Sequence, residues 1–304
     1  MTCDPIDADV PIEAHATQDD SYRLAPMRTL LRQLSPTIPE SEMTAMNFGD
    51  LRNALIEIDP LNTKHIKKVN AAEAEFWHRS SGVRVGYSDE ILGFECGGQQ
   101  WVSEVAFPTG SLARSGDPGK AEGGRTGAYT GADIAFMRRL LRTIASQNLP
   151  APAPLEQRWS ASSRSLMSPV GISDDANVRA DVANGIVDKD TVHCWVGIIM
   201  YLPTSDGSRS VDNERRKITE AFTEYAELLR PQLDQYCAHE HWAKIEVRRP
   251  QSAEALRQRL GDRFPVGKFA AARERLDPKG ILSNDLYDTL LPTSPTAGAA
   301  RGAS

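Results

Sequence analysis

The chain has 304 residues, 40% of them hydrophobic and 25% charged, a composition typical of a globular protein. Its net charge of -6 and the lack of a long basic run argue against a general nucleic-acid-binding protein. No apolar run of about 18 residues occurs, so the sequence predicts no transmembrane helix. The four cysteines show neither a CxxC pair nor zinc-ligand spacing, and we interpret them as free thiols without a metal site.

The N-terminal part of the chain is predicted to be helical after an acidic start. Residues 1–20 contain no Lys or Arg and no signal-peptide segment, which predicts a mobile acidic arm and no visible transit peptide. Apolar spacing predicts a helix over 27–34, another over 51–58 with Asp50 as its N-cap, and a long one from 63 to between 77 and 79.

A strand region and a helix come next in the chain. Residues 83–87 and 101–107 have strand character, and Gly97-Gly98 between them suits a turn or bulge. The glycine pair is not a phosphate-binding loop, because no helix comes directly after it. Residues 111–131 form a polar insertion, and an amphipathic pattern predicts a helix over 132–147.

The most informative stretch comes after a proline-rich lead-in at 150–154. Proline favours extended backbone, so a strand is expected next, with Glu156 and Arg158 on one face and Leu155, Gln157 and Trp159 on the other. A carboxylate and a guanidinium on one face fit either a surface ion pair or an anchor for a polyhydroxy or carbonyl substrate. The spacing alone leaves both interpretations open.

The remaining chain alternates between strands and helices. We expect a second polar insertion at 173–191, a strand over 194–202 buried on both faces, and a strand starting at His241. Three helices are predicted, over 212–229, 252–260 and 264–275. Pro231 would end the first of them. The fold class is therefore α+β, a large antiparallel sheet with helices on one side.

Five runs, in this order, resemble the galactonolactone dehydrogenases, an aldonolactone-oxidase branch of the vanillyl-alcohol-oxidase flavoprotein superfamily. The runs are GYSDEILGFECGGQQWVSE at 86–104, PAPAPLEQRW at 150–159, WVGIIMYLPT at 195–204, HEHWAKIEV at 239–247 and LDPKGILSN at 276–284. The HWxK and LDPxxIxxN parts are shared by the wider aldonolactone oxidases, and the longer runs narrow the match.

The resemblance implies a domain plan in which FAD is held mainly by a partner chain. The family has an N-terminal FAD-binding domain, and this sequence resembles only the region C-terminal to that domain. We therefore expect a cap or substrate domain at 21–235 and a C-terminal segment at 236–292 that packs on a separate FAD-binding half. The low-complexity composition of 293–304 predicts a disordered tail. Two functions are implied: the substrate half of a split enzyme, or a structural subunit associated with respiratory complex I. Mitochondrial inner-membrane association and cytochrome c as acceptor are implied likewise.

The resemblance also implies roles for particular residues. Glu156 and Arg158 would bind the lactone beneath the flavin. Lys244, the lysine of the HWxK run, would lie near the substrate and the flavin as a further catalytic residue, with a surface lysine at a strand end as the alternative. Cys96 would lie beside the substrate region, either as a redox-sensitive thiol or as a small buried side chain. Three further residues would lie near the cofactor, each with packing as the alternative role: His241, Trp242 and Asn284.

Overall fold

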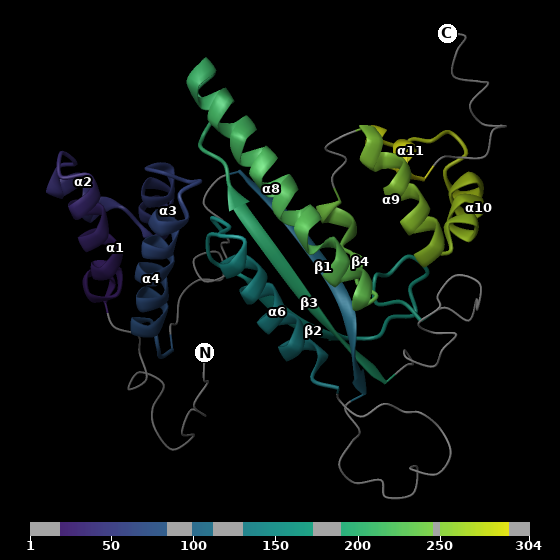
Figure 1. Ribbon diagram of the computed structural model, residues 1–304. Coiled ribbons are helices and arrows are strands. Elements are labelled where there is room, and N and C mark those ends of the chain that lie inside the picture. The colour runs from purple at the N-terminus through teal and green to yellow at the C-terminus, as the bar shows by residue number, and fades with distance from the viewer. Residues whose placement is uncertain (1–18, 84–98, 112–129, 173–189, 246–249, 292–304) are drawn as a thin grey trace, which may run out of the picture. The chain divides into compact units, whose positions relative to one another are not determined.

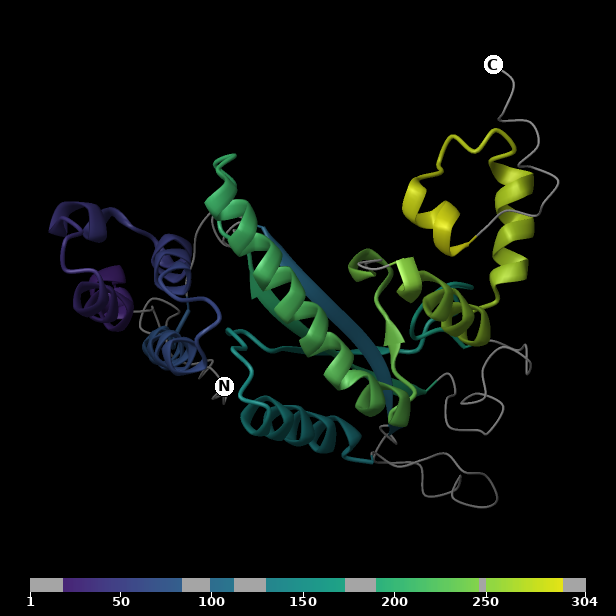
Figure 2. The same ribbon diagram turned by 45° about the horizontal axis from the view of Figure 1, so that its top comes forward.

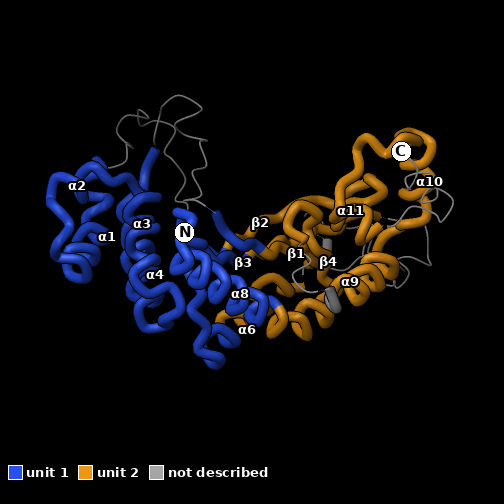
Figure 3. The backbone as a smooth tube through the Cα atoms, turned by 90° about the horizontal axis from the view of Figure 1, so that it is seen from above, with its two compact units in different colours: residues 1–102, 142–155, 198–226 blue, residues 103–141, 156–197, 227–304 orange. Residues whose placement is uncertain are grey.

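The computed structural model describes residues 19–83, 99–111, 130–172, 190–245 and 250–291 (Figure 1). The chain divides into two compact units, one of residues 1–102, 142–155 and 198–226, the other of residues 103–141, 156–197 and 227–304 (Figure 3). Several predictions lie outside the described residues: most of the acidic arm, most of the 83–87 strand, the Gly97-Gly98 turn, Cys96, both polar insertions and the tail.

Four helices lie in the N-terminal part of the first unit: α1 (Asp20–Leu34), α2 (Glu40–Ala45), α3 (Phe48–Glu57) and α4 (Thr63–Arg79). Their apolar faces make one core, with Leu24, Met27, Leu31, Leu51, Leu55, Ile66, Val69 and Phe76 among its buried members. The predicted end of α1 is confirmed, but the helix begins seven residues before the predicted start. Its N-cap is Asp19, whose carboxylate accepts a hydrogen bond from the Tyr22 amide.

The sequence narrows the N-cap residue of α4 to two candidates but does not predict that of α3. For α4 the sequence leaves Asn62 and Thr63 as the two candidate caps, and Asn62 is the N-cap, accepting hydrogen bonds from the Lys64 and His65 amides. For α3 the predicted cap was wrong, because Asn47 is the N-cap and Asp50 is the third helical residue. Each side chain accepts a hydrogen bond from the other residue's amide at 3.0 Å, a reciprocal capping box. Asp50 therefore does help to cap this helix, but as its third residue and not as the N-cap.

In the part of the chain that the structure describes, a four-stranded sheet confirms the α+β class. Its order is β2-β3-β1-β4, from β1 (Gln100–Ser111), β2 (Glu156–Ala161), β3 (Thr191–Tyr201) and β4 (His239–Glu240). β2 is antiparallel to β3, so that Glu156 lies opposite Gly197 and Arg158 opposite Trp195. β3 is buried along almost its whole length, which confirms the strand predicted to be covered on both faces.

Two helices, α6 (Ala132–Ser146) and α8 (Arg209–Gln235), lie along the same side of the sheet (Figure 1 and Figure 2). Phe107 of β1 stacks on Phe136 of α6 with ring centroids 4.5 Å apart. The Trp101 indole of β1 donates to the Thr219 hydroxyl of α8 at 2.8 Å. Side chains alternate along β1, so Glu104 and Ala106 lie on the face opposite Phe107.

The predicted end of α8 at Pro231 was wrong, because the helix continues to Gln235. Proline removes one intrahelical hydrogen bond but cannot end a helix whose next turn is anchored elsewhere. That next turn is anchored in the interior, where Leu233 is buried and the Gln232 amide donates to the Phe136 carbonyl at 2.9 Å. Tertiary contacts therefore override the local signal.

The C-terminal part begins with β4 and a single 3-10 turn, η2 (Trp242–Lys244), and continues with α9 (Pro250–Arg263), α10 (Val266–Leu276) and α11 (Asp285–Leu290). The strand predicted from His241 was wrong. The chain leaves the sheet after Glu240, and the His241 ring accepts a hydrogen bond from the Ala243 amide at 3.2 Å, which caps the turn. α9 starts before Ser252, at Pro250, a position that favours proline. None of the helices in the described ranges is long and apolar enough to cross a membrane.

Candidate functional site

The side chains of β2 alternate as the sequence predicts. Two of them lie on the α6 side of the sheet, where the Gln157 amide donates to the Cys194 thiol at 3.3 Å and the Trp159 indole donates to the Asp133 carboxylate at 3.0 Å. Glu156 and Arg158 therefore project from the opposite face, and both are exposed. The helices on the other side of the sheet leave this pair accessible.

Arg158 reaches across β3 to a carboxylate that no interpretation of the sequence identified. Its Nε donates to Glu104 Oε1 at 2.8 Å, and its guanidinium lies over the Trp195 ring, 4.3 Å from the centroid. The Arg158 side chain is 53% exposed, whereas that of Glu104 is only 10% exposed. The ion pair is thus buried on one side and open on the other, and it does not include Glu156.

A glycine of β3, Gly197, lies beside both carboxylates. A Cβ at Gly197 would lie 3.6 Å from Glu156 Oε2 and 3.9 Å from Glu104 Cγ. A single methyl group would fit at ordinary contact distance, but a longer side chain would fill the gap between Glu156 and Glu104. The site therefore combines a glycine floor, two carboxylates and a guanidinium.

His241 joins this cluster from the end of β4. Its Nε2 lies 3.9 Å from Glu104 Oε2, and its ring meets the Trp195 ring edge to face at 5.5 Å. Lys244 lies three residues later on η2, half-buried, with its backbone amide bonded to the His241 carbonyl at 2.8 Å. The neighbouring Trp242 belongs elsewhere, since its indole donates to the Met167 carbonyl at 2.6 Å. His241 and Trp242 are adjacent in the chain and were both predicted to lie near the cofactor, but their side chains contact different parts of the protein.

Sequence reasoning missed Glu104, Trp195 and Gly197 as site residues. A glutamate within the mostly apolar run 101–107 was the available signal for Glu104. The other two lie in an apolar run that the sequence explained as core. Only the register of β2 against β3 brings both of them to Glu156 and Arg158.

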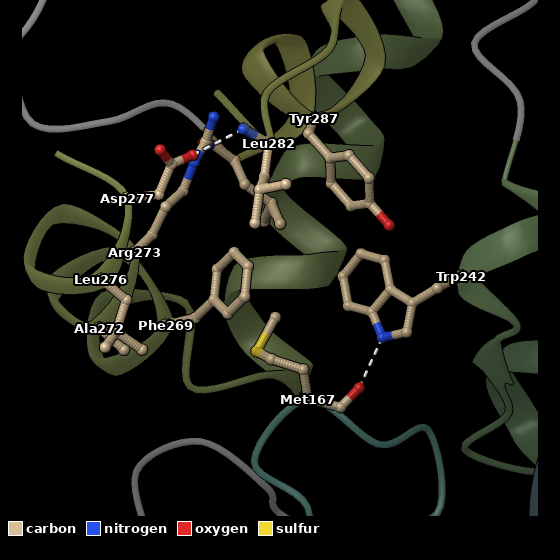
Figure 4. Close-up of a pocket in the computed structure, with 10 residues that line it drawn as sticks. Met167, Trp242, Phe269, Ala272, Arg273, Leu276, Asp277, Leu282 and Tyr287 are labelled. Carbon is tan, nitrogen blue, oxygen red and sulfur yellow. Dashed lines mark hydrogen bonds between the residues drawn. The ribbon is translucent and has the colours of Figure 1, made fainter. Parts of the chain in front are cut away.

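A pocket lies among the C-terminal helices of the second unit (Figure 4). It has a volume of about 420 Å³ and is lined by Met167, Trp242, Phe269, Ala272, Arg273, Leu276, Asp277, Leu282, Tyr287 and Leu291. Its two charged side chains are engaged within the protein: Arg273 binds Asp288 at 2.7 Å, and Asp277 accepts hydrogen bonds from two backbone amides. Asn284 caps α11 by accepting from the Tyr287 amide at 2.9 Å. The pocket is accordingly apolar in character.

Two of the cysteines should differ sharply in reactivity. Burial raises the pKa of the Cys194 thiol to about 11, whereas Cys237 is exposed. Because the thiolate is the reactive species, we expect Cys194 in the folded chain to be alkylated at least about a hundredfold more slowly than Cys237 at neutral pH. Iodoacetamide labelling and peptide mapping measure both rates in one sample. In urea the two rates should converge, and equal rates in the folded chain would contradict the prediction.

Comparison with known proteins places this geometry in a family. A family profile described as D-arabinono-1,4-lactone oxidase matches residues 132–290, more than half of the chain. A protein from Brassica oleracea named mitochondrial L-galactono-1,4-lactone dehydrogenase is 43% identical over 283 residues, 91% of this chain and 42% of the relative. The enzyme of the same name from Arabidopsis thaliana is 44% identical over 265 residues, 86% of this chain and 38% of the relative.

These matches confirm the resemblance seen in the sequence. The chain spans about two fifths of the length of the curated relatives it matches, and the match covers their C-terminal part. The profile match includes β2, β3, β4 and η2, and with them Glu156, Arg158, Trp195, His241 and Lys244. The chain belongs to the D-arabinono-1,4-lactone oxidase family.

Proposed function

We propose that the exposed sheet face at Glu156 and Arg158 is the substrate side of a galactonolactone dehydrogenase, which oxidises L-galactono-1,4-lactone. In this proposal FAD is held mainly by a partner polypeptide that corresponds to the N-terminal half of the relatives. The observation that carries it is the arrangement of Arg158, Glu156 and Glu104 on a face that α6 and α8 do not cover. The relatives' shared name supports the choice of lactone.

The residues on this face fit the substrate side of a flavin site. Within the described residues, Arg158 makes one hydrogen bond through Nε, so both terminal nitrogens remain for a ligand oxygen. The exposed Glu156 carboxylate can accept a hydrogen bond or a proton from a lactone hydroxyl. The half-buried Lys244 would add a second cationic donor near His241.

The chemistry assigns each group a task. Oxidation of a carbinol removes a hydride, which bound FAD would accept, and a proton, which a base must take. In the proposed site Glu156 takes the proton or orients the hydroxyl that loses it. Arg158 stabilises the negative charge that develops on the substrate oxygen. His241, next to Glu104, would relay protons or serve only to pack.

We further propose a mitochondrial location at the inner membrane, with cytochrome c as electron acceptor, since the relatives are named mitochondrial. Leu276 and Leu282, which line the pocket of Figure 4, and Ile281, which precedes Leu282 in the chain, are all more than 70% exposed, which supports a contact with another protein. That surface favours a second candidate function as well, a non-catalytic subunit associated with respiratory complex I.

Purification of the chain together with its natural partners separates the two candidates. We expect the complex to carry flavin absorbance, to contain a second polypeptide, and to reduce cytochrome c when L-galactono-1,4-lactone is added. A complex that lacks flavin would overturn the enzymatic proposal. Recovery of the flavin-free chain with respiratory complex I subunits would support the structural role.

A further inference from the structure

We propose that Glu104 is a positioning residue for Arg158: it fixes the guanidinium through Nε and keeps it apart from Glu156. The catalytic importance of this positioning rests on the proposed function, whereas the positioning itself involves only residues of this chain. Neither the motifs nor the comparisons assign Glu104 a role.

The geometry shows how Glu104 selects one orientation of Arg158. The two residues lie on β1 and β2, separated by β3, and the arginine passes over Trp195 to make the 2.8 Å bond. The Trp195 indole is itself held by a 2.8 Å hydrogen bond to the Ser160 hydroxyl. A charge-assisted bond and a cation–π contact therefore act on one guanidinium from two sides.

The bond to Nε, and not to a terminal nitrogen, has a chemical consequence. A carboxylate that pairs with both terminal nitrogens would occupy the fork that recognises planar oxygen pairs. Glu104 engages the guanidinium at its base and leaves Nη1 and Nη2 without another bond among the described residues. The arginine is thus oriented without its recognition edge being used.

Glu104 also determines what Glu156 can do. Glu156 lies two residues from Arg158 on the same strand face, within reach of an arginine side chain. In the structure the arginine pairs with Glu104 instead, although that carboxylate is 54 residues away in the chain. Without Glu104, Arg158 would turn to Glu156, and the site would lose a guanidinium and a carboxylate together.

The first test observes Arg158 directly in the full chain. We expect a resolved, slowly exchanging Nε–H signal in nuclear magnetic resonance spectra, assigned by its absence from Arg158→Lys. Glu104→Ala should abolish the slow exchange, and Glu104→Gln, which retains an acceptor oxygen, should keep it in part. An unchanged signal in Glu104→Ala would overturn the proposal. If Glu104→Ala fails to fold, faster exchange in Glu104→Gln is the expected result, and wild-type exchange there overturns it.

The control for the first test is Glu73→Gln, which removes another buried carboxylate without touching Arg158. Glu73 is 2% exposed, and burial raises its pKa, so the neutral side chain suits its surroundings. The Arg158 signal should be identical in this variant and in the unchanged chain. A changed signal in Glu73→Gln would mean that the exchange rate reports a general loss of stability, and it would count against the positioning role of Glu104.

The second test is a double-mutant cycle in the flavin-containing complex. Glu104→Ala should lower kcat/KM for the lactone about 10- to 100-fold, as expected for the loss of a hydrogen bond to a charged group. In an Arg158→Lys background the same change should have less than about a twofold effect, because Glu104 acts through Arg158. Equal effects in both backgrounds would overturn the positioning role.

The two tests separate failure of this inference from failure of the proposed function. If Arg158→Lys leaves turnover unchanged, the proposed function has failed at this site, while the magnetic resonance result still decides whether Glu104 fixes Arg158. If Arg158→Lys impairs turnover but Glu104→Ala does not, the proposed function stands and the inference about Glu104 is wrong.

Discussion

Replacement of Arg158 by alanine is expected to lower kcat for lactone oxidation about 10²–10³-fold in the flavin-containing complex. The guanidinium offers two terminal nitrogens on the exposed side of its ion pair with Glu104. In the proposed reaction these donors meet the oxygen on which negative charge develops, so their loss affects the transition state more than substrate binding. Steady-state kinetics with L-galactono-1,4-lactone and cytochrome c measure kcat and KM separately.

Two further variants define what this result means. Arg158→Lys keeps the charge but loses the planar fork and should remain well below wild-type kcat. Arg216→Ala removes an arginine on α8 whose side chain is 62% exposed and which pairs with Glu220, and it should leave kcat within about twofold. If Arg158→Ala and Glu156→Ala both leave lactone turnover unchanged, the assignment of the site is wrong.

The second large effect is expected at Glu240, which links β4 to two helices. Its carboxylate accepts from Arg230 of α8 at 3.1 Å and from Arg259 of α9 at 3.3 Å, and it lies 3.5 Å from Arg263. Its side chain is 11% exposed. Glu240→Ala leaves three partly buried cations without their shared carboxylate, and we expect the free energy of unfolding to fall by about 3–5 kcal/mol. Urea denaturation measures the change.

A matched surface variant tests whether burial is the reason. Glu254→Ala breaks an ion pair with Arg257 on α9 in which the glutamate side chain is 78% exposed. The loss there should stay below about 1 kcal/mol, because solvent screens exposed pairs. Equal losses for Glu240→Ala and Glu254→Ala would contradict the argument.

The contribution of Glu240 should also depend on pH in a defined direction. Burial by itself would raise the pKa of this carboxyl, but Arg230, Arg263 and Arg259 outweigh burial and hold the pKa below its usual range. A carboxylate with a lowered folded-state pKa stabilises fully above the unfolded-state pKa, about 4.3 for glutamate, and this stabilisation is lost as the pH falls through the folded-state value. The difference in unfolding free energy between the unchanged chain and Glu240→Gln should therefore shrink below about pH 4.

Much of the fold can be predicted from local patterns in the sequence. The helix at Thr63–Arg79, the strand at Thr191–Tyr201 and the alternation along β2 were predicted because the signals are periodic and short in range. The errors occurred both where distant contacts override a local preference and where a local capping arrangement differs from the predicted one. Pro231 stays within α8 because Gln232 and Leu233 are anchored in the interior, and the strand predicted from His241 is replaced by a capped turn.

The sequence alone determined that Glu156 and Arg158 share a face, since strand alternation is a local property of the backbone, and its motifs identified the family. The tertiary structure decided which partner Arg158 has. Glu104 and Trp195 reach the arginine only because the strands are ordered β2-β3-β1, and Gly197 lies opposite Glu156 only in the observed register. Strand order and register join residues far apart in the chain, and no local pattern encodes such pairings.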